Sequence, residues 1–254
     1  MSNDSYLRDL LTKQELTDKE LDALRDLRDK IENSLRSSLK SVQRVYYAGS
    51  FGKKTMIREQ YDLDIVVYWA NDCGFSLKNI YEGVGNVLRK DWKYVNPKTV
   101  AWELRFQGGF HIDVVPGRAL DNTYRYANLY RRDKDTSLQT SIKVHIDTVR
   151  NSGRRDVIRL MKLWRVKRSV PFKKSLALEL ITIEGCKGLR TDELEKQLIS
   201  ALTHVRDNIL TVKIVDPANT NNVVSDEITN EERKLIKAAA DAAVKTTYWS
   251  GVLT

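Results

Sequence analysis

The 254-residue sequence has few of the residues that build cross-linked or membrane-spanning proteins. Its two cysteines, Cys73 and Cys186, are far apart, so neither a disulfide framework nor a zinc framework is expected. No window of 18 apolar residues predicts a transmembrane helix. The N-terminus lacks the basic segment and apolar core of a secretory signal. We therefore expect a globular protein in a reducing compartment, the cytoplasm.

The charge balance is basic. There are 43 Lys and Arg residues against 34 Asp and Glu residues, a formal net charge of +9. Such a surplus favours polyanionic partners, such as nucleotides or RNA, although a basic surface that is merely solvated gives the same number. Hydrophobic residues make up 41% of the chain, enough for a sizeable core.

The order of the apolar patterns predicts two lobes. Apolar residues at helical spacing predict a long helix over 17–41, after a shorter one near 4–13. Strand-like runs and one helix follow, at 42–48, 62–69, 77–91, 98–106, 110–115 and 122–131. Helical patterns then dominate, at 138–150, 155–168, 175–185, 191–208 and 230–247. The expected fold is α/β, in the α+β sense, with a mixed β-sheet lobe at 1–135 and a helical lobe at 136–254.

The segment 49–67, GSFGKKTMIREQYDLDIVV, carries the first candidate site. Gly49 and Ser50 form a turn whose backbone N–H groups and hydroxyl suit phosphate oxygens. Asp62 and Asp64 alternate along a strand, so both carboxylates lie on one face. Adjacent carboxylates repel unless a cation lies between them. A metal-bound nucleoside triphosphate is therefore plausible here.

A third carboxylate follows in a hairpin. Gln107, Gly108 and Gly109 separate two strand-like runs, and Asp113 lies within the second run. A buried aspartate needs a basic partner or a metal. If this strand lies beside 62–69, then Asp62, Asp64 and Asp113 form an oxygen-rich site for two Mg²⁺ ions, which can clamp the attacking and leaving oxygens of an in-line displacement.

These motifs resemble a known superfamily. The Gly-Ser turn, DLDIVV and HIDVV together resemble the DNA polymerase β-like nucleotidyltransferases. The later stretches RLMKLWRVKRSVPFKKSLALE, VDPANTNNVV and TTYWSGV are similar to bacterial cGAS/DncV-like nucleotidyltransferases (CD-NTases) and 2′-5′ oligoadenylate synthetases. The resemblance implies a bilobal fold, in which the catalytic core binds metal through Asp62, Asp64 and Asp113.

The resemblance also implies nucleotide contacts. Gly49 and Ser50 would hold the triphosphate, and Lys162 and Ser175 match positions that contact phosphates in relatives, where the helical lobe closes the nucleotide cleft. From the residues alone, Lys162 is one of many lysines on an amphipathic helix, and Ser175 can be a helix cap. Both interpretations remain open at this stage.

The implied function is template-independent synthesis of an oligonucleotide second messenger from nucleoside triphosphates, ATP among them, with release of pyrophosphate. Two Mg²⁺ ions would serve as cofactors, with Mn²⁺ as an alternative. By resemblance, the product would be a cyclic or short linear signal in bacterial anti-phage (CBASS-type) defence, sensed by a separate effector protein. RNA could act as an activator or acceptor. The alternatives are an RNA 3′-terminal nucleotidyltransferase of the tRNA or poly(A) type, and a non-catalytic RNA- or nucleotide-binding module.

Overall fold

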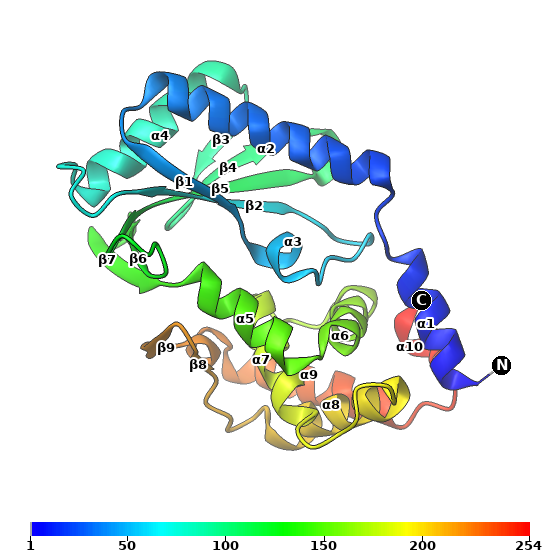
Figure 1. Ribbon diagram of the computed structural model, residues 1–254. Helices are drawn as coiled ribbons and strands as arrows, with labels where there is room; N and C mark the ends of the chain where they lie inside the picture. Colours follow the sequence, from blue (N-terminus) through cyan, green and yellow to red (C-terminus); the bar gives the residue numbers. More distant parts are fainter. Residues whose placement is uncertain (1) are drawn as a thin grey trace. The chain divides into compact units, whose positions relative to one another are not determined.

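The computed structural model describes residues 2–254, which form two compact units (Figure 1). The strand-rich unit comprises Leu16–Lys54 and Tyr61–Ile146. The helical unit comprises the chain up to Glu15, a short insertion at Thr55–Gln60, and Asp147–Thr254. The expected mixture of a β-sheet lobe and a helical lobe is confirmed. The functional division into 1–135 and 136–254 stays a prediction, and the first helix packs within the helical unit.

The strand-rich unit is built on one mixed sheet with strand order β1-β2-β5-β4-β3, in which β6 pairs with β5 and β7 pairs with β6. Strands β2 and β5 run parallel, whereas the other neighbouring pairs in this sheet are antiparallel. Its elements are α2 (Asp18–Ser38), β1 (Val42–Tyr47), α3 (Gly49–Lys53), β2 (Leu63–Trp69), α4 (Leu77–Asp91), β3 (Val95–Pro97), β4 (Trp102–Arg105), η1 (Gln107–Gly109), β5 (His111–Ala119), β6 (Ala127–Arg131) and β7 (Thr136–Thr140).

Two helices cover one face of this sheet. Helix α2 begins with a complete capping box, in which the Thr17 side chain and Glu20 satisfy each other's backbone N–H groups. Helix α4 packs against β5, and its Gly85 lies against the Trp102 indole, where an added Cβ would come within 2.2 Å of a ring carbon. Figure 1 shows α2 and α4 on the same side of the strands.

The alternation of β2 decides what the opposite face carries. Leu63, Ile65 and Val67 are buried and share one face, so Asp62 and Asp64 share the other. Farther along β2, the aspartate face becomes apolar, since Val66 packs in a cluster with residues of β6. The sheet therefore presents carboxylates at one end of this face only.

Several element boundaries differ from the sequence predictions. The predicted helix over 138–150 is wrong at its start, because Thr136–Thr140 pairs with β6 as strand β7, and α5 spans Ile142–Ser152. The predicted strand over 98–106 is shortened to β4, since the Lys98 N–H bonds to the Ala101 carbonyl in a turn. The segment around Gly49 is the first turn of the short helix α3.

The helical unit contains α1 (Asn3–Lys13), the end of α5, α6 (Arg155–Lys167), α7 (Ser175–Gly185), α8 (Leu194–Asn208), β8 (Val215–Asp216), β9 (Asn219–Val223), η2 (Val224–Glu227), α9 (Asn230–Val244) and α10 (Ser250–Leu253). Helix α8 begins three residues after the predicted start at residue 191, with Glu193 in the N-cap position. Thr229 caps α9, again with a capping box.

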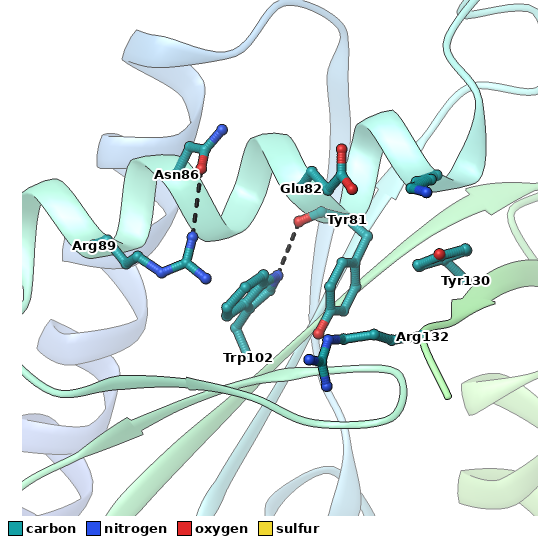
Figure 2. A pocket seen from close by; sticks show the side chains of 8 residues that line it. Tyr81, Glu82, Asn86, Arg89, Trp102, Tyr130 and Arg132 are labelled. Atoms are coloured by element: carbon teal, nitrogen blue, oxygen red, sulfur yellow. Dashed lines mark hydrogen bonds between the residues drawn. The ribbon is translucent and has the colours of Figure 1, made fainter. Parts of the chain in front are cut away.

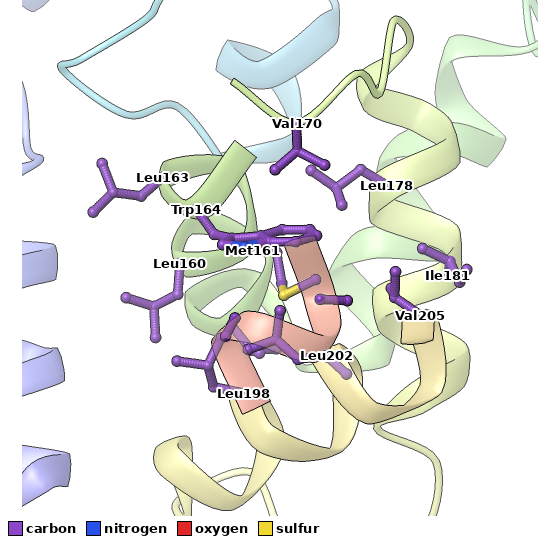
Figure 3. Close-up of a cluster of buried hydrophobic side chains, with 14 of the residues drawn as sticks. Leu160, Met161, Leu163, Trp164, Val170, Leu178, Ile181, Leu198, Leu202 and Val205 are labelled. Atoms are coloured by element: carbon purple, nitrogen blue, oxygen red, sulfur yellow. The ribbon is translucent and has the colours of Figure 1, made fainter. Parts of the chain in front are cut away.

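The core of the helical unit centres on α6. Trp164 and Met161 are fully buried and meet side chains of α7 and α8, as Figure 3 shows around Leu178, Leu198 and Leu202. The helix predicted over 155–168 is thereby confirmed. Burial of such side chains stabilises the fold by roughly 1.5–3 kcal/mol each, so this core fixes α6 and α7 against one another.

Candidate active site

Gly49 is the residue around which the site closes. The Ala48 N–H donates to the Asp64 carbonyl at 2.9 Å, which places the start of α3 beside β2. Gly49 has a φ of +49°, and a Cβ there would lie 1.6 Å from Asp64 Oδ2. A side chain would therefore collide with the carboxylate in a backbone region that already favours glycine. Gly49 lets the backbone of α3 approach Asp64.

Ser50 places a hydroxyl at the same turn. Its Oγ is buried and has no hydrogen-bond partner among the residues that the structure describes. A buried polar atom without a partner carries a desolvation cost. The first backbone N–H groups of a helix also lack partners within the helix. Together, the hydroxyl and these N–H groups can receive phosphate oxygens.

The three predicted aspartates lie on neighbouring strands. Asp64 of β2 is in register with Asp113 of β5, so their side chains project from the same face. Asp62, two residues before Asp64, shares this face, and its Oδ2 lies 3.5 Å from Nε2 of His111. The placement of the β5 strand beside β2, on which the three-carboxylate prediction depended, is confirmed. The roles of these residues in metal binding stay predictions.

The electrostatics of this cluster favour an added cation. Burial, followed by the charges of Asp62 and Asp113, raises the pKa of Asp64 to about 7. Burial also raises the pKa of Asp113, although the hydrogen bond and the charge from Lys98 oppose that shift. A carboxylate whose pKa is raised in this way lacks sufficient positive charge around it. The residues present therefore fit a divalent ion with oxygen ligands.

Two residues of the site were missed by the sequence analysis. Glu103 of β4 is in register with Asp113 and is 8% exposed, and Lys98 donates to both carboxylate oxygens of Asp113 at 2.7 and 3.0 Å. Carboxylate oxygens of Glu103 and Asp113 and a ring nitrogen of His111 all lie within 4.8 Å of one another. The short turn of the predicted hairpin was the available signal, because it fixes which residue of 98–106 faces Asp113.

Lys162 and Ser175 lie in the helical unit and are engaged there. Lys162 Nζ forms a buried ion pair with Glu179 at 2.7 Å and donates to Thr55 Oγ1 at 2.8 Å. Ser175 Oγ accepts from Arg165 at 3.0 Å. The alternative interpretation of Ser175 as a helix cap is wrong, because α7 begins at Ser175 itself and Lys174 is its N-cap. Contact of either residue with phosphates stays a prediction.

A separate recess of about 480 Å³ lies on the helix-covered face of the sheet (Figure 2). Trp102 and Tyr81 form part of its wall, and Arg89 stacks over the Trp102 ring at 4.3 Å. Trp102 precedes Glu103 in β4, so its side chain projects away from the face that carries Asp113. The recess therefore contributes no residue to the carboxylate cluster. Its remaining lining residues are Lys78, Glu82, Asn86, Tyr130 and Arg132.

None of the helices in residues 2–254 is both long enough and apolar enough to cross a membrane.

The curated proteins similar to this chain include two from Escherichia coli. One is the cyclic AMP-AMP-AMP synthase of Escherichia coli strain MS 115-1, which is 26% identical over 288 aligned positions covering 91% of this chain and 90% of the relative. Another is the CBASS oligonucleotide cyclase CdnC of E. coli strain KTE188, also 26% identical, covering 88% of this chain and 84% of the relative.

The fold agrees with a solved structure of such a protein. E. coli MS115-1 CdnC with ATP matches with a TM-score of 0.77 and 23% identity, covering 99% of this chain and 98% of that one. This likeness confirms the predicted polymerase β-like nucleotidyltransferase fold. The family model of the Second Messenger Oligonucleotide or Dinucleotide Synthetase domain matches residues 1–152, which include all three aspartates. The chain therefore belongs to this family of bacterial CD-NTase nucleotidyltransferases, as the resemblance implied.

Proposed function

We propose that the protein joins nucleoside triphosphates, ATP among them, into a cyclic oligonucleotide second messenger and releases pyrophosphate at each step. The observation that carries this proposal is the register of Asp64 with Asp113 beside Gly49, within a family of second-messenger synthetases. The relatives named as a cyclic AMP-AMP-AMP synthase and a CBASS cyclase support a cyclic product and a role in anti-phage defence.

The residues divide the chemistry among themselves. Ser50 Oγ and the start of α3 bind the triphosphate, since Ser50 Oγ has no hydrogen-bond partner in residues 2–254 and the first N–H groups of a helix lack partners within the helix. Asp62, Asp64 and Asp113 would hold two Mg²⁺ ions, which would supply positive charge to the attacking and leaving oxygens. Asp113 would be the ligand closest to the attacking hydroxyl and would aid its deprotonation.

A ribose hydroxyl oxygen of one nucleotide attacks the α-phosphorus of the next. A phosphorus–oxygen bond forms, the bond to pyrophosphate breaks, and the proton leaves the attacking oxygen. Cyclisation is the same step within one linear intermediate. The ATP-bound structure of CdnC supports ATP as a substrate. A separate effector would sense the product, and RNA would serve as an activator or acceptor.

The test is an incubation of purified protein with all four α-labelled nucleoside triphosphates and Mg²⁺ or Mn²⁺, with and without RNA. We expect pyrophosphate release and a labelled product that resists phosphatase, as a cyclic species does. Asp64→Asn should abolish formation of this product. Asp72→Asn is the control and should not, because Asp72 is an exposed residue beyond the other end of β2.

Two results would contradict the proposal. Extension of the added RNA without a phosphatase-resistant product would favour an RNA-terminal nucleotidyltransferase. The absence of pyrophosphate release under every condition, including added extract of phage-infected cells, would favour a nucleotide-binding module without catalysis.

A further inference from the structure

We infer that the Lys98 ammonium acts as an internal cation of the carboxylate site. In the metal-free protein it pairs with Asp113. When a divalent ion binds, Lys98 leaves Asp113 and pairs with Glu103, its second partner. This inference rests on the proposed function, in which Asp113 is a metal ligand. It concerns which group pairs with Asp113 before the metal binds, and how that group affects the affinity for the metal.

The backbone of Lys98 is fixed. Its N–H donates to the Ala101 carbonyl at 2.8 Å, closing the turn between β3 and β4. Its own carbonyl accepts from the Tyr81 hydroxyl at 2.9 Å. The side chain therefore starts from a defined point next to β4 and reaches Asp113 on the adjacent strand β5.

The ammonium group lies where a metal would compete with it. Both oxygens of Asp113 accept from Lys98 Nζ, so a metal bound to either oxygen must share or replace that hydrogen bond. Nζ also lies 3.5 Å from Glu103 Oε1. It thus contacts two of the three side chains, Glu103, His111 and Asp113, whose ligand atoms are close enough together to hold one ion. The ammonium takes the cation position of this group.

Glu103 supplies the place to which Lys98 can turn. Asn96 donates to Glu103 Oε2 at 3.2 Å, and Arg105 also donates to this oxygen. These bonds hold the carboxylate in place while its other oxygen faces Lys98. The Lys98 side chain is 41% exposed, against 17% for Asp113. Its ammonium can therefore shift toward Glu103 without being buried.

The consequence is a defined effect on metal affinity. The Lys98 ammonium and a metal ion at Asp113 repel each other, and the repulsion is twice as large for a divalent ion as for a monovalent one. Lys98→Met removes the competing charge while retaining most of the side-chain volume. We expect about tenfold tighter Mn²⁺ binding. Lys98→Arg retains the charge and should leave the affinity within about twofold of wild type.

The experiment measures free Mn²⁺ by electron paramagnetic resonance at pH 8.5, without nucleotide, so that the readout does not depend on turnover. Lys93→Met is the matched control, because Lys93 is exposed and its ammonium lies over the Tyr94 ring rather than the carboxylates. We expect Lys98→Met to bind Mn²⁺ more tightly than wild type and Lys93→Met to bind it equally.

A second readout separates this role from a merely structural one. In EDTA, Lys98→Met leaves Asp113 without its ammonium partner, so its Tm should fall below that of wild type. Saturating Mn²⁺ should abolish or reverse the difference. An equal loss of Tm in both conditions, with unchanged Mn²⁺ affinity, would overturn the inference.

Failure of the metal site itself gives a different pattern. Wild type and Asp64→Asn would then bind Mn²⁺ equally weakly, which contradicts the proposed function. If wild type binds Mn²⁺ through the aspartates and Lys98→Met matches it, only the role of Lys98 is refuted.

Discussion

Replacing Asp64 with asparagine should stabilise the metal-free protein while abolishing its activity. Burial and the neighbouring charges of Asp62 and Asp113 raise the pKa of Asp64 from 3.8 to about 7. Ionising Asp64 therefore costs free energy in the folded protein, although the proposed reaction needs the charged form. Asparagine has nearly the same shape and never ionises, so the variant avoids this cost.

The magnitude follows from proton linkage. Between pH 3.8 and about 7, the folded state holds a proton on Asp64 that the unfolded state has released. The free energy of unfolding therefore falls as the pH rises through this window, and the full loss is present above it. Roughly three pKa units at about 1.4 kcal/mol each give an upper value of about 4 kcal/mol. We expect Asp64→Asn to recover about 2–4 kcal/mol at pH 8.

The assay is urea unfolding in EDTA at pH 8 and at pH 5, with Asp72→Asn as the control. At pH 5, Asp64 is already protonated in the folded wild type, so most of the advantage of the variant should vanish. Saturating Mn²⁺ at pH 8 should reverse the order, because only the wild type retains the full ligand set. The reasoning would be refuted if the variant were less stable than wild type in EDTA at pH 8. It would also be refuted if the gain in free energy of unfolding over wild type were the same at both pH values.

Three further results are expected. Gly49→Ala should reduce nucleotide transfer and Mn²⁺ binding at least tenfold, since its Cβ would lie 1.6 Å from Asp64 Oδ2; near-normal values of both would contradict the close approach. Mn²⁺ affinity, measured by titration, should rise up to about tenfold per pH unit below pH 7 and level off above it, because Asp64 must lose its proton. Glu179→Leu should cost about 3–5 kcal/mol in urea unfolding because it removes the carboxylate that forms the buried ion pair with Lys162, and adding Lys162→Met should restore much of it.

Local spacing was enough to find the centre of the candidate site. Two aspartates alternating in a β-branched run must share a face of any strand, and a glycine turn before them can approach closely only without a side chain. The antiparallel pairing of β4 with β5 followed from the glycine turn between them. The parallel pairing of β2 with β5 had to be assumed, because the sequence does not reveal which distant strands become neighbours.

The parts that sequence did not reveal depend on long-range contacts. Nothing near Lys162 in the chain indicates that Glu179 and Thr55 would become its partners. The insertion at Thr55–Gln60 joins the helical unit because Ile57 packs into that unit's core. Residues 136–140 read as the start of a helix, but pairing with β6 overrides local propensity.

The charges around Asp113 give a physical reason why the proposed cation site would include a lysine. Carboxylates close enough to share a divalent ion repel one another without it, as the raised pKa of Asp64 shows. A chain that folds before it binds metal must tolerate that repulsion. Lys98 and Lys53 both lower the pKa of Asp64, yet burial and the other aspartates outweigh them. If the lysines neutralised the aspartates completely, little electrostatic attraction for a metal ion would remain. Partial neutralisation is therefore compatible both with folding of the metal-free chain and with metal binding.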